Sequence, residues 1–174
     1  MNSKQIFKVI LAVGFIASFA QITIDIGDIP ITGQTFAVLF IALIFNKLEA
    51  MSIILLYIIL GTVGLPIFAD GSSGIDKLLG NSGGFIIGFF VATFAVSVLK
   101  NKIQNLSLAT IFLLTILGTV LIIICGLMRL SFSFGLEKAL EYGFYPFWKG
   151  ALIKIILGSF GVWFYNRITT RRLD

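Results

Sequence analysis

Six long apolar stretches run through the sequence, separated by short polar connections. Their approximate ranges are residues 6–26, 34–46, 50–66, 84–100, 106–128 and 147–165. A helix needs about 20 mostly apolar residues to cross a bilayer. Because the stretches are continuous rather than alternating, they favour helices over the strands of a barrel. The pattern predicts an all-α membrane protein with six transmembrane helices, forming a single transmembrane domain over residues 1–174.

The second stretch is shorter than the others. Its core, Phe36 to Phe45, would be only about 15 Å long as a helix at 1.5 Å per residue. We therefore expect this helix to begin inside the preceding residues 29–35.

Composition supports a membrane protein and excludes several kinds of chemistry. Of the 174 residues, 58% are hydrophobic and 12% are charged, against about 25% charged in soluble domains. There is no histidine and only one cysteine, Cys125. This excludes histidine-based acid–base catalysis, His-ligated metals and an intrachain disulfide, and we predict neither a metal site nor a cofactor. We interpret the net charge of +5 as flanking charge of membrane spans, not as a nucleic-acid surface.

Basic residues in the connections indicate the orientation of the chain. With the N-terminus inside, the cytoplasmic set is Lys4, Lys8, Lys47, Lys100, Lys102, Arg167, Arg171 and Arg172, and the outer set is Lys77, Arg129, Lys138 and Lys149. Eight inner charges against four outer ones, with Lys154 left out as intramembrane, predict that both termini are cytoplasmic. The first 20 residues also resemble a signal peptide. Because five more apolar stretches follow, we interpret them as the first span.

The three outer connections carry the irregular backbone. They cover about residues 25–35, 67–83 and 129–146, and all three prolines of the chain lie at the outer ends of the spans. Irregular backbone at membrane depth is tolerated where protein buries it or where it lines a cavity. Polar side chains accompany these connections: Gln34, Thr35, Asn81 and Ser82. The arrangement predicts an outward-facing site for a small molecule, and we interpret Asp25 and Asp28 as its solvated entrance.

Lys154 is a charged residue well inside the last apolar stretch. It lies seven residues after Phe147, about 10 Å into the helix. Charges at such depth usually face the protein interior and have a partner. The last stretch contains no acidic residue. Two interpretations stay open: the partner is the carboxylate of a ligand, or the side chain reaches a headgroup or an acid on another element.

Further residues are suited to contacts with the membrane interface or with another subunit. Arg129 and Trp148 are typical of the outer membrane interface, and Trp148 is also a candidate to stack on a ligand ring. Gly14 and Ser18, with Ala17 beside them, form a small-residue face on the first helix, suited to internal packing or to another membrane subunit.

The chain has no phosphate-binding loop and no chain of buried acids. If it moves a solute uphill, another protein supplies the energy.

Four segments together resemble a known family. Residues 29–39 (IPITGQTFAVL), 56–69 (LYIILGTVGLPIFA), 79–85 (LGNSGGF) and 146–154 (PFWKGALIK) are similar, in order, to the signatures of the BioY family. These proteins are the biotin-specific substrate-binding (S) components of energy-coupling-factor (ECF) transporters. The resemblance covers nearly the whole chain.

The resemblance implies a fold, a ligand and partners. It implies a six-helix S-component fold with an outward-facing biotin pocket in the bacterial plasma membrane. It further implies a transmembrane coupling protein and two ATP-binding cassette subunits as partners, with Gly14, Ala17 and Ser18 as the docking surface. The chain itself is then not an enzyme, and biotin is its transported ligand.

The resemblance also assigns binding residues and exposes one departure. The ligand-binding residues that it implies or that the outer connections suggest are Gln34, Thr35, Asn81, Phe85, Trp148, Ala151 and Lys154. Family members generally carry Asp where this chain has Ala151, and that Asp would suit a ureido N–H donor. The alternative ligand is therefore a ring-bearing acid without the ureido group, such as lipoate.

Two other functional classes fit the sequence less well. A membrane-embedded enzyme would need a convergent catalytic set, and only scattered groups such as Asp70, Asp76 and Lys154 are available. A purely structural membrane partner is the other class, and tight ligand binding would count against it.

Overall fold

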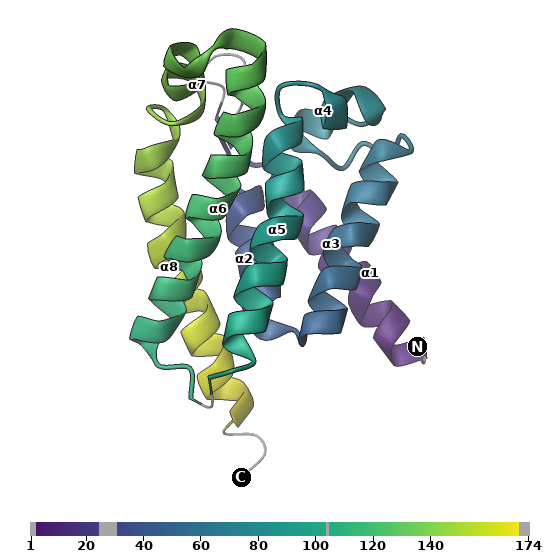
Figure 1. Cartoon of the computed structure of the whole chain (residues 1–174). Helices are drawn as coiled ribbons and strands as arrows, with labels where there is room; N and C mark the ends of the chain where they lie inside the picture. Colours follow the sequence, from purple (N-terminus) through teal and green to yellow (C-terminus); the bar gives the residue numbers. More distant parts are fainter. Residues whose placement is uncertain (1–2, 25–30, 104, 171–174) are drawn as a thin grey trace.

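The computed structural model describes residues 3–24, 31–103 and 105–170. Its elements are α1 (Ser3–Ala20), β1 (Thr23–Ile24), β2 (Ile31–Thr32), α2 (Gln34–Ile44), α3 (Lys47–Thr62), η1 (Ala69–Gly71), α4 (Ile75–Leu79), α5 (Gly83–Lys100), α6 (Leu108–Phe134), α7 (Leu136–Gly143) and α8 (Phe147–Thr170). The longer helices run up and down in one bundle (Figure 1). The two short strands pair antiparallel, with Thr23 opposite Thr32.

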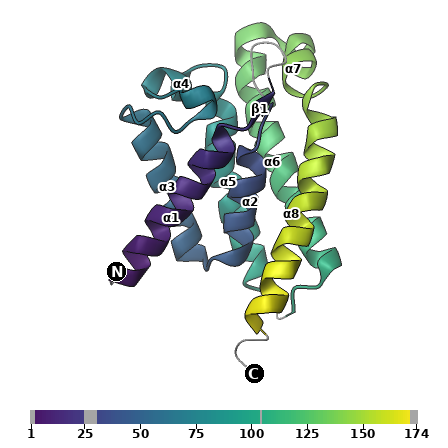
Figure 2. The same ribbon diagram turned by 180° about the vertical axis from the view of Figure 1, so that it is seen from behind.

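The short helix α2 lies at the centre of the bundle. It packs against α1, α3, α5, α6 and α8, and Figures 1 and 2 show it enclosed from both sides. Residues on all its faces are buried, including Val38, Ile41 and Ala42. A helix that is apolar all round is expected in such a position. Its N-terminus at Gln34 lies within the bundle, so the first residue of this helix is placed close to the protein interior.

Helices α5 and α6 approach each other closely along a face of small residues. A Cβ atom on Gly84 would lie 2.4 Å from the carbonyl oxygen of Cys125, and one on Gly88 would lie 2.9 Å from the Cα atom of Ile122. Only glycine permits this separation at both positions. Small residues four apart allow such contacts between helices in a membrane, and they fix α5 and α6 as one wall of the molecule.

The two ends of the bundle differ in construction. The start of α1 and the end of α8 lie at the same end, and Figures 1 and 2 show α4, α7 and the strands at the other. At the first end the chain turns by capped helix ends: Asn46 Oδ1 accepts a hydrogen bond from Glu49 N at 3.0 Å. Lys100 Nζ also donates to the carbonyl oxygens of Leu43 and Phe45, at the end of α2. The irregular segments are gathered at the α4 and α7 end.

The observed helices coincide with the six predicted stretches, but several of their ends differ, and the last helix continues past residue 165 to Thr170. The first helix ends at Ala20 rather than near residue 26, because Gln21 to Ile24 leave the helix and join the strand pair. The third helix begins at Lys47 and ends at Thr62. The fifth continues to Phe134, and most of the predicted loop 129–146 is helical. The second helix begins at Gln34, inside the expected range.

Within the described residues, four helices are long and apolar enough to cross a membrane. They are Ser3–Ala20, Gly83–Lys100, Leu108–Phe134 and Phe147–Thr169, and α2 is a shorter apolar helix. Asp25 and Asp28, interpreted above as a loop entrance, lie outside the described residues.

Candidate ligand-binding cavity

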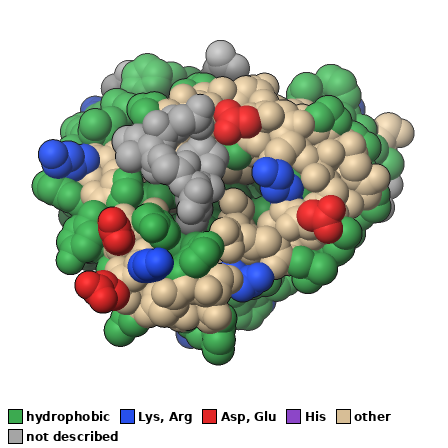
Figure 3. Space-filling view, turned by 90° about the horizontal axis from the view of Figure 1, so that it is seen from above, with side chains coloured by type: hydrophobic (Ala, Val, Ile, Leu, Met, Phe, Trp, Pro, Cys, Tyr) green, Lys and Arg blue, Asp and Glu red, His purple; other side chains and the backbone are tan. Residues whose placement is uncertain are grey.

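A cavity of about 260 Å³ lies among the irregular segments at the α4 and α7 end. Its lining comes from β2, the start of α2, η1, α4, α5, α6 and α8. Figure 3 looks onto this end of the molecule, where basic and acidic side chains are distributed among apolar ones. Elements far apart in the sequence therefore meet around one space.

The structure brings five of the seven predicted ligand-binding residues to this cavity. Gln34, Thr35, Phe85, Ala151 and Lys154 all line it. They come from the first turn of α2, the first turn of α5 and the second turn of α8. The remaining two predicted residues lie elsewhere.

Asn81 and Trp148 are not among the lining residues. Asn81 lies half-buried in the turn between α4 and α5. Trp148 is 43% exposed, and Lys149 Nζ lies 5.6 Å from the centroid of its ring. An exposed indole beside a cation is typical of a membrane interface. The geometry therefore favours an interfacial role for Trp148 over stacking on a ligand ring.

Lys154 is bonded to the strand pair instead of to an acid. Its Nζ atom donates to the carbonyl oxygen of Thr32 at 2.9 Å. Among the residues that the structure describes, no carboxylate lies within ion-pair distance of this ammonium group. A backbone carbonyl fixes the side chain without neutralising it. Within those residues, the ammonium group of Lys154 lines the cavity beside a neutral partner.

Gln34 belongs to a hydrogen-bonded chain that crosses the wall of the cavity. Its Oε1 accepts from Thr32 Oγ1 at 2.9 Å, and its Nε2 donates to Tyr57 Oη at 2.5 Å. The Tyr57 hydroxyl in turn donates to the carbonyl oxygen of Ile67 at 2.9 Å. Gln34 and Tyr57 are both buried. Such a fully connected network fixes β2, α2, α3 and the segment after α3 relative to one another.

The interior of the cavity is aromatic. The rings of Phe85 and Phe147 stack with centroids 5.5 Å apart, and both residues line the cavity with Phe89. Phe68 lines it too, packed so closely on Gly61 that a Cβ there would lie 2.3 Å from its ring. An apolar interior with a few polar groups is typical of a small-molecule site.

The sequence interpretation missed the charged groups of the segment between α3 and α5. Asp70 and Lys77 line the cavity, and both side chains are exposed, which places them near its opening. In the sequence, Asp70 is a candidate only for a catalytic group, and Lys77 is only a charge that indicates membrane orientation. Their position between closely spaced glycines was the available signal, because such segments carry irregular backbone that folds over a site.

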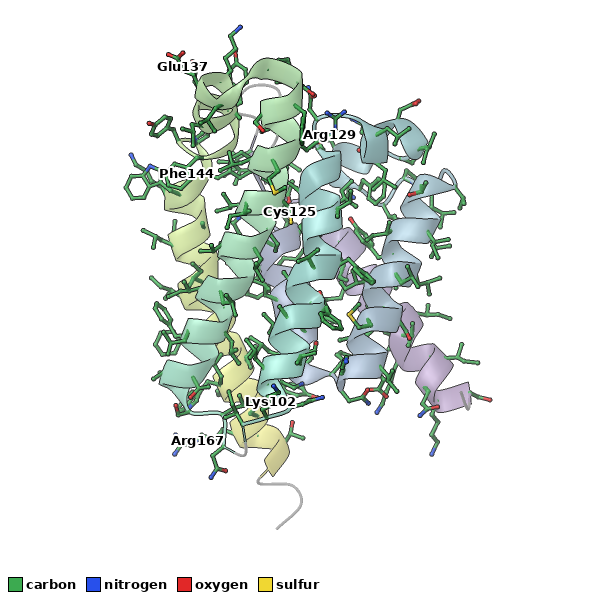
Figure 4. All side chains as sticks on the ribbon, in the orientation of Figure 1. Lys102, Cys125, Arg129, Glu137, Phe144 and Arg167 are labelled. Carbon is green, nitrogen blue, oxygen red and sulfur yellow. The ribbon has the colours of Figure 1, made fainter. Side chains whose placement is uncertain are left out.

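Arg129 links two elements beside the cavity without lining it. Its guanidinium donates to Ser133 Oγ at 2.7 Å and to the carbonyl oxygen of Leu79. Figure 4 shows Arg129 beside the end of α6 at the level of α4. These bonds hold the end of α4 against α6. The geometry supports a structural role for Arg129 at the interface.

The small residues of α1 lie on an open face of the bundle. A Cβ atom on Gly14 would have no other atom within 4 Å. Ser18 is exposed and its hydroxyl donates to the Gly14 carbonyl oxygen at 2.9 Å, while Ala17 is half-buried. Exposed apolar side chains accompany them, among them Phe7, with 62% of its surface exposed, and Leu11, with 58%. Gly14 and Ser18 therefore do not serve packing inside the bundle, which was one of the two roles predicted for this face.

Comparison with known proteins identifies relatives over most of the chain. The sequence model of the BioY family matches residues 1–171. A Rickettsia prowazekii protein named probable biotin transporter BioY is 34% identical over 154 residues, which cover 88% of this chain and 79% of the relative. The biotin transporter BioY2 of Lactococcus lactis is 35% identical over 160 residues, covering 90% of this chain and 87% of the relative.

The fold also has a counterpart among solved structures. The crystal structure of an S-component for biotin from an ECF-type ABC transporter superposes with a TM-score of 0.86. The match covers 96% of this chain and 95% of that chain, at 22% sequence identity. At this identity the likeness establishes the fold.

Proposed function

Because the chain belongs to the BioY family, we propose that it is the membrane subunit that captures biotin for uptake. The observation that carries the proposal is the cavity, where an aromatic interior, Gln34 and Lys154 converge. Its volume of about 260 Å³ lies just below the roughly 300–1,000 Å³ typical of ligand pockets. A cavity of this size suits a small vitamin. The relatives reported above are named as transporters, which counts against a membrane enzyme.

The chemistry of the cavity matches a ring-bearing carboxylic acid. The aromatic side chains would cover the rings and the aliphatic chain, and Lys154 would bind the carboxylate by a charge-assisted hydrogen bond. Gln34 and Thr35 would shape the wall and fix the orientation of the ligand. Asn81 and Trp148 lie outside the lining, so ligand contact by either would require a rearrangement of the segment that carries it.

Ala151 supports a second candidate ligand. It lines the cavity, and its methyl group offers no acceptor to a ureido N–H. Lipoate has a carboxylate and a ring but no ureido group, so it makes no such demand. The same fold with lipoate as its ligand is therefore the alternative to biotin.

Calorimetric titration of the detergent-purified protein with biotin, lipoate and biotin amide tests both candidates. The proposal predicts tight biotin binding and weaker binding of the amide, because the amide lacks the negative carboxylate that Lys154 would bind. Lipoate binding without biotin binding would reassign the ligand on an unchanged fold. Equal affinities for biotin and its amide would remove the role given to Lys154.

We further propose that the chain crosses the bacterial plasma membrane six times. In addition to the four helices long enough to span, α2 and α3 would cross as a central, shortened pair. Helices α1 and α8 begin and end on one side, where Figure 4 also shows Lys102 and Arg167. Basic residues mark the cytoplasmic side, so both termini would be cytoplasmic and the cavity would face outward. In a Cys125→Ser background, Lys138→Cys should react with an impermeant maleimide in intact cells, and Lys102→Cys should not.

The partners would be a transmembrane coupling protein and two ATP-binding cassette subunits. The open face of α1, with Gly14, Ala17 and Ser18, supports docking because small residues allow helices to approach closely. The chain has no phosphate-binding loop, so ATP hydrolysis would take place on the partners. Copurification of tagged protein with such subunits, lost on substitution of Gly14 by leucine, tests this assignment.

A further inference from the structure

The segments that the sequence assigns to the outer side of the membrane carry more acidic than basic side chains. The acids are Asp25, Asp28, Asp70, Asp76, Glu137 and Glu141, and the bases are Lys77, Arg129, Lys138 and Lys149. Six negative charges against four positive ones disfavour the approach of an anion to this end of the molecule. The proposed ligands are carboxylates, so a local reversal of this charge at the cavity would favour their entry.

The lining of the cavity has the opposite charge balance. Its charged residues are Asp70, Lys77 and Lys154, which are one acid and two bases. Asp70 is exposed, and its Oδ1 accepts a hydrogen bond from Thr23 Oγ1 at 2.6 Å. A cleft with apolar walls and an excess of one charge concentrates its electric field toward the opening. The cavity is therefore a basic recess at an end of the molecule that is acidic in sequence.

Lys77 is held at this recess by the way α4 is fastened at both of its ends. The N–H group of Gly74, just before α4, donates to a carbonyl oxygen in the last turn of α3 at 2.8 Å. At the end of α4, Arg129 donates to the carbonyl oxygen of Leu79. The side chain of Lys77 is exposed and lines the cavity, whereas that of its neighbour Asp76 does not line it. Among residues 3–24, 31–103 and 105–170, no carboxylate lies within ion-pair distance of Lys77.

The two lysines of the lining differ in depth. Lys154 is half-buried on α8 and bonded to the Thr32 carbonyl oxygen, whereas Lys77 is exposed on the short helix α4. An exposed charge at the rim of a binding site mainly sets the association rate and its salt dependence. A buried charge that bonds the ligand mainly sets the dissociation rate. The two positions therefore suit successive steps of capture.

We infer that Lys77 is the entry residue of the cavity, which attracts an anionic ligand from solution before the carboxylate reaches Lys154. The inference rests on the proposed function, because it requires an anionic ligand in this cavity. Lys77 then sets the rate of capture and not the strength of the finished complex. Asp70 acts at the same opening with the opposite sign and slows the approach of the anion.

Stopped-flow measurement of biotin association in an uncharged detergent tests the inference. At about 0.1 M salt, Lys77→Gln should lower the association rate constant about threefold and Lys77→Glu about tenfold. Their dissociation rates should stay within about twofold of the wild-type rate. At about 1 M salt, where the Debye length is about 3 Å, the association rates should also agree within about twofold.

The matched control is Lys138→Glu. It makes the same change of charge at an exposed residue of α7 that does not line the cavity. Biotin should associate with this variant within about twofold of the wild-type rate, because the Debye length of about 10 Å at 0.1 M salt screens distant exposed charges. A slowing equal to that of Lys77→Glu would mean that the total charge of the outer end matters and not the position of Lys77, which would overturn the inference.

Two further readouts separate attraction by charge from a change in the shape of the opening. Biotin amide has no net charge, so it should associate with Lys77→Glu and with the wild type at the same rate. Asp70→Asn keeps an oxygen that can accept from Thr23, and it should speed biotin association about threefold. The inference fails if Lys77→Glu slows the amide as much as biotin, or if Asp70→Asn does not speed biotin. It also fails if Lys77→Glu changes only the dissociation rate, because Lys77 would then be a contact of the bound ligand.

The outcomes distinguish this inference from the proposed function. If the wild type binds biotin and Lys77→Glu associates with it at the wild-type rate, Lys77 is not the entry residue although the proposed function stands. If the wild type binds lipoate instead of biotin, slower association of lipoate with Lys77→Glu supports the inference on the reassigned ligand, and an unchanged rate overturns it. If the wild type binds neither acid, both proposals are overturned together.

Discussion

The cavity and the open face of α1 are built on opposite principles. Around the cavity several polar groups have defined partners, as in the chain from Thr32 through Gln34 to Tyr57. The α1 face instead presents small and apolar side chains, such as Gly14, with no neighbour. Ordered polar groups are what selective recognition of a small molecule requires, and an open face of small residues is what a helix partner requires. The proposed capture and the proposed docking would therefore take place in different regions of one small chain.

One connection links the two regions. Gln21 follows the last turn of α1 and bonds Ala17 O, Phe68 O and Gly71 N. Phe68 lines the cavity, and Ala17 belongs to the predicted docking surface. A displacement of α1 on docking would reach the segment between α3 and α5 through these bonds. Mutations in one region should therefore leave the property that depends on the other region unchanged, except at Gln21, which contacts both.

The largest effect on capture is expected at Lys154. Lys154→Ala should weaken biotin binding by about 100-fold or more, because it removes the charged donor from a partly buried site. Titration calorimetry measures the affinity directly. Lys149→Ala is the matched control, since Lys149 lies on the same helix but outside the cavity lining and should leave affinity unchanged. Equal affinities for the two variants would contradict the role of Lys154.

A mutation on the open face of α1 should instead lower biotin uptake and leave biotin affinity unchanged. Gly14→Leu should lower biotin uptake by cells by about tenfold or more, because a branched side chain keeps a partner helix at a distance. Its affinity for biotin in detergent should match the wild type, since a Cβ atom on Gly14 would meet no other atom within 4 Å. Uptake of labelled biotin and calorimetry on the same variant give both values. Loss of binding together with uptake would mean that the two regions are not separate.

A smaller effect is expected inside the wall of the cavity. Gln34→Ala leaves the hydroxyl of Tyr57 without its buried donor, which should cost about 1–3 kcal/mol of stability and about tenfold in affinity. Tyr57→Phe removes the same bond from the other side. Thermal melting and titration of both single variants and the double variant measure the coupling. Strictly additive effects would show that the two side chains do not act through their shared bond.

The smallest effect is expected at the connection between the regions. Gln21→Ala should weaken biotin binding only about threefold, mainly through faster release, because the segment around Asp70 loses its fastening to α1. Uptake should fall further than affinity does. Stopped-flow measurement of biotin release tests this expectation. Thr62→Ala, whose hydrogen bond to Ile58 stays within one helix, is the control and should release biotin at the wild-type rate.

The sequence predicted the helices well because lipid imposes a simple rule on them. Continuous apolar runs must be helical in a bilayer, so all six stretches were located and only their ends were wrong. For the last turns of the fifth helix the sequence instead predicts a loop, because Arg129 and the serines after it interrupt the apolar run. The helix nevertheless continues to Phe134, where Gly135 with φ of 82° ends it.

Residues of the cavity could be predicted from the sequence where their type is unusual for their position. Lys154 was found because a charge inside a span needs an explanation, and Gln34 because it precedes an apolar run. Asp70 was not predicted, because acids in loops are common and its partner Thr23 lies 47 residues away in the sequence. No local pattern reports such a contact. The left-handed backbone of Asp70 is visible only in three dimensions.

The location of the ligand is the central claim, and amide hydrogen exchange tests it most directly. The detergent-purified protein would be compared with and without saturating biotin, by mass spectrometry of peptides covering residues 63–82. This segment carries Phe68, Asp70 and Lys77 into the cavity lining, so biotin is predicted to slow its exchange. Unchanged exchange there, in protein shown by calorimetry to be saturated with biotin, would place the ligand elsewhere and contradict the account.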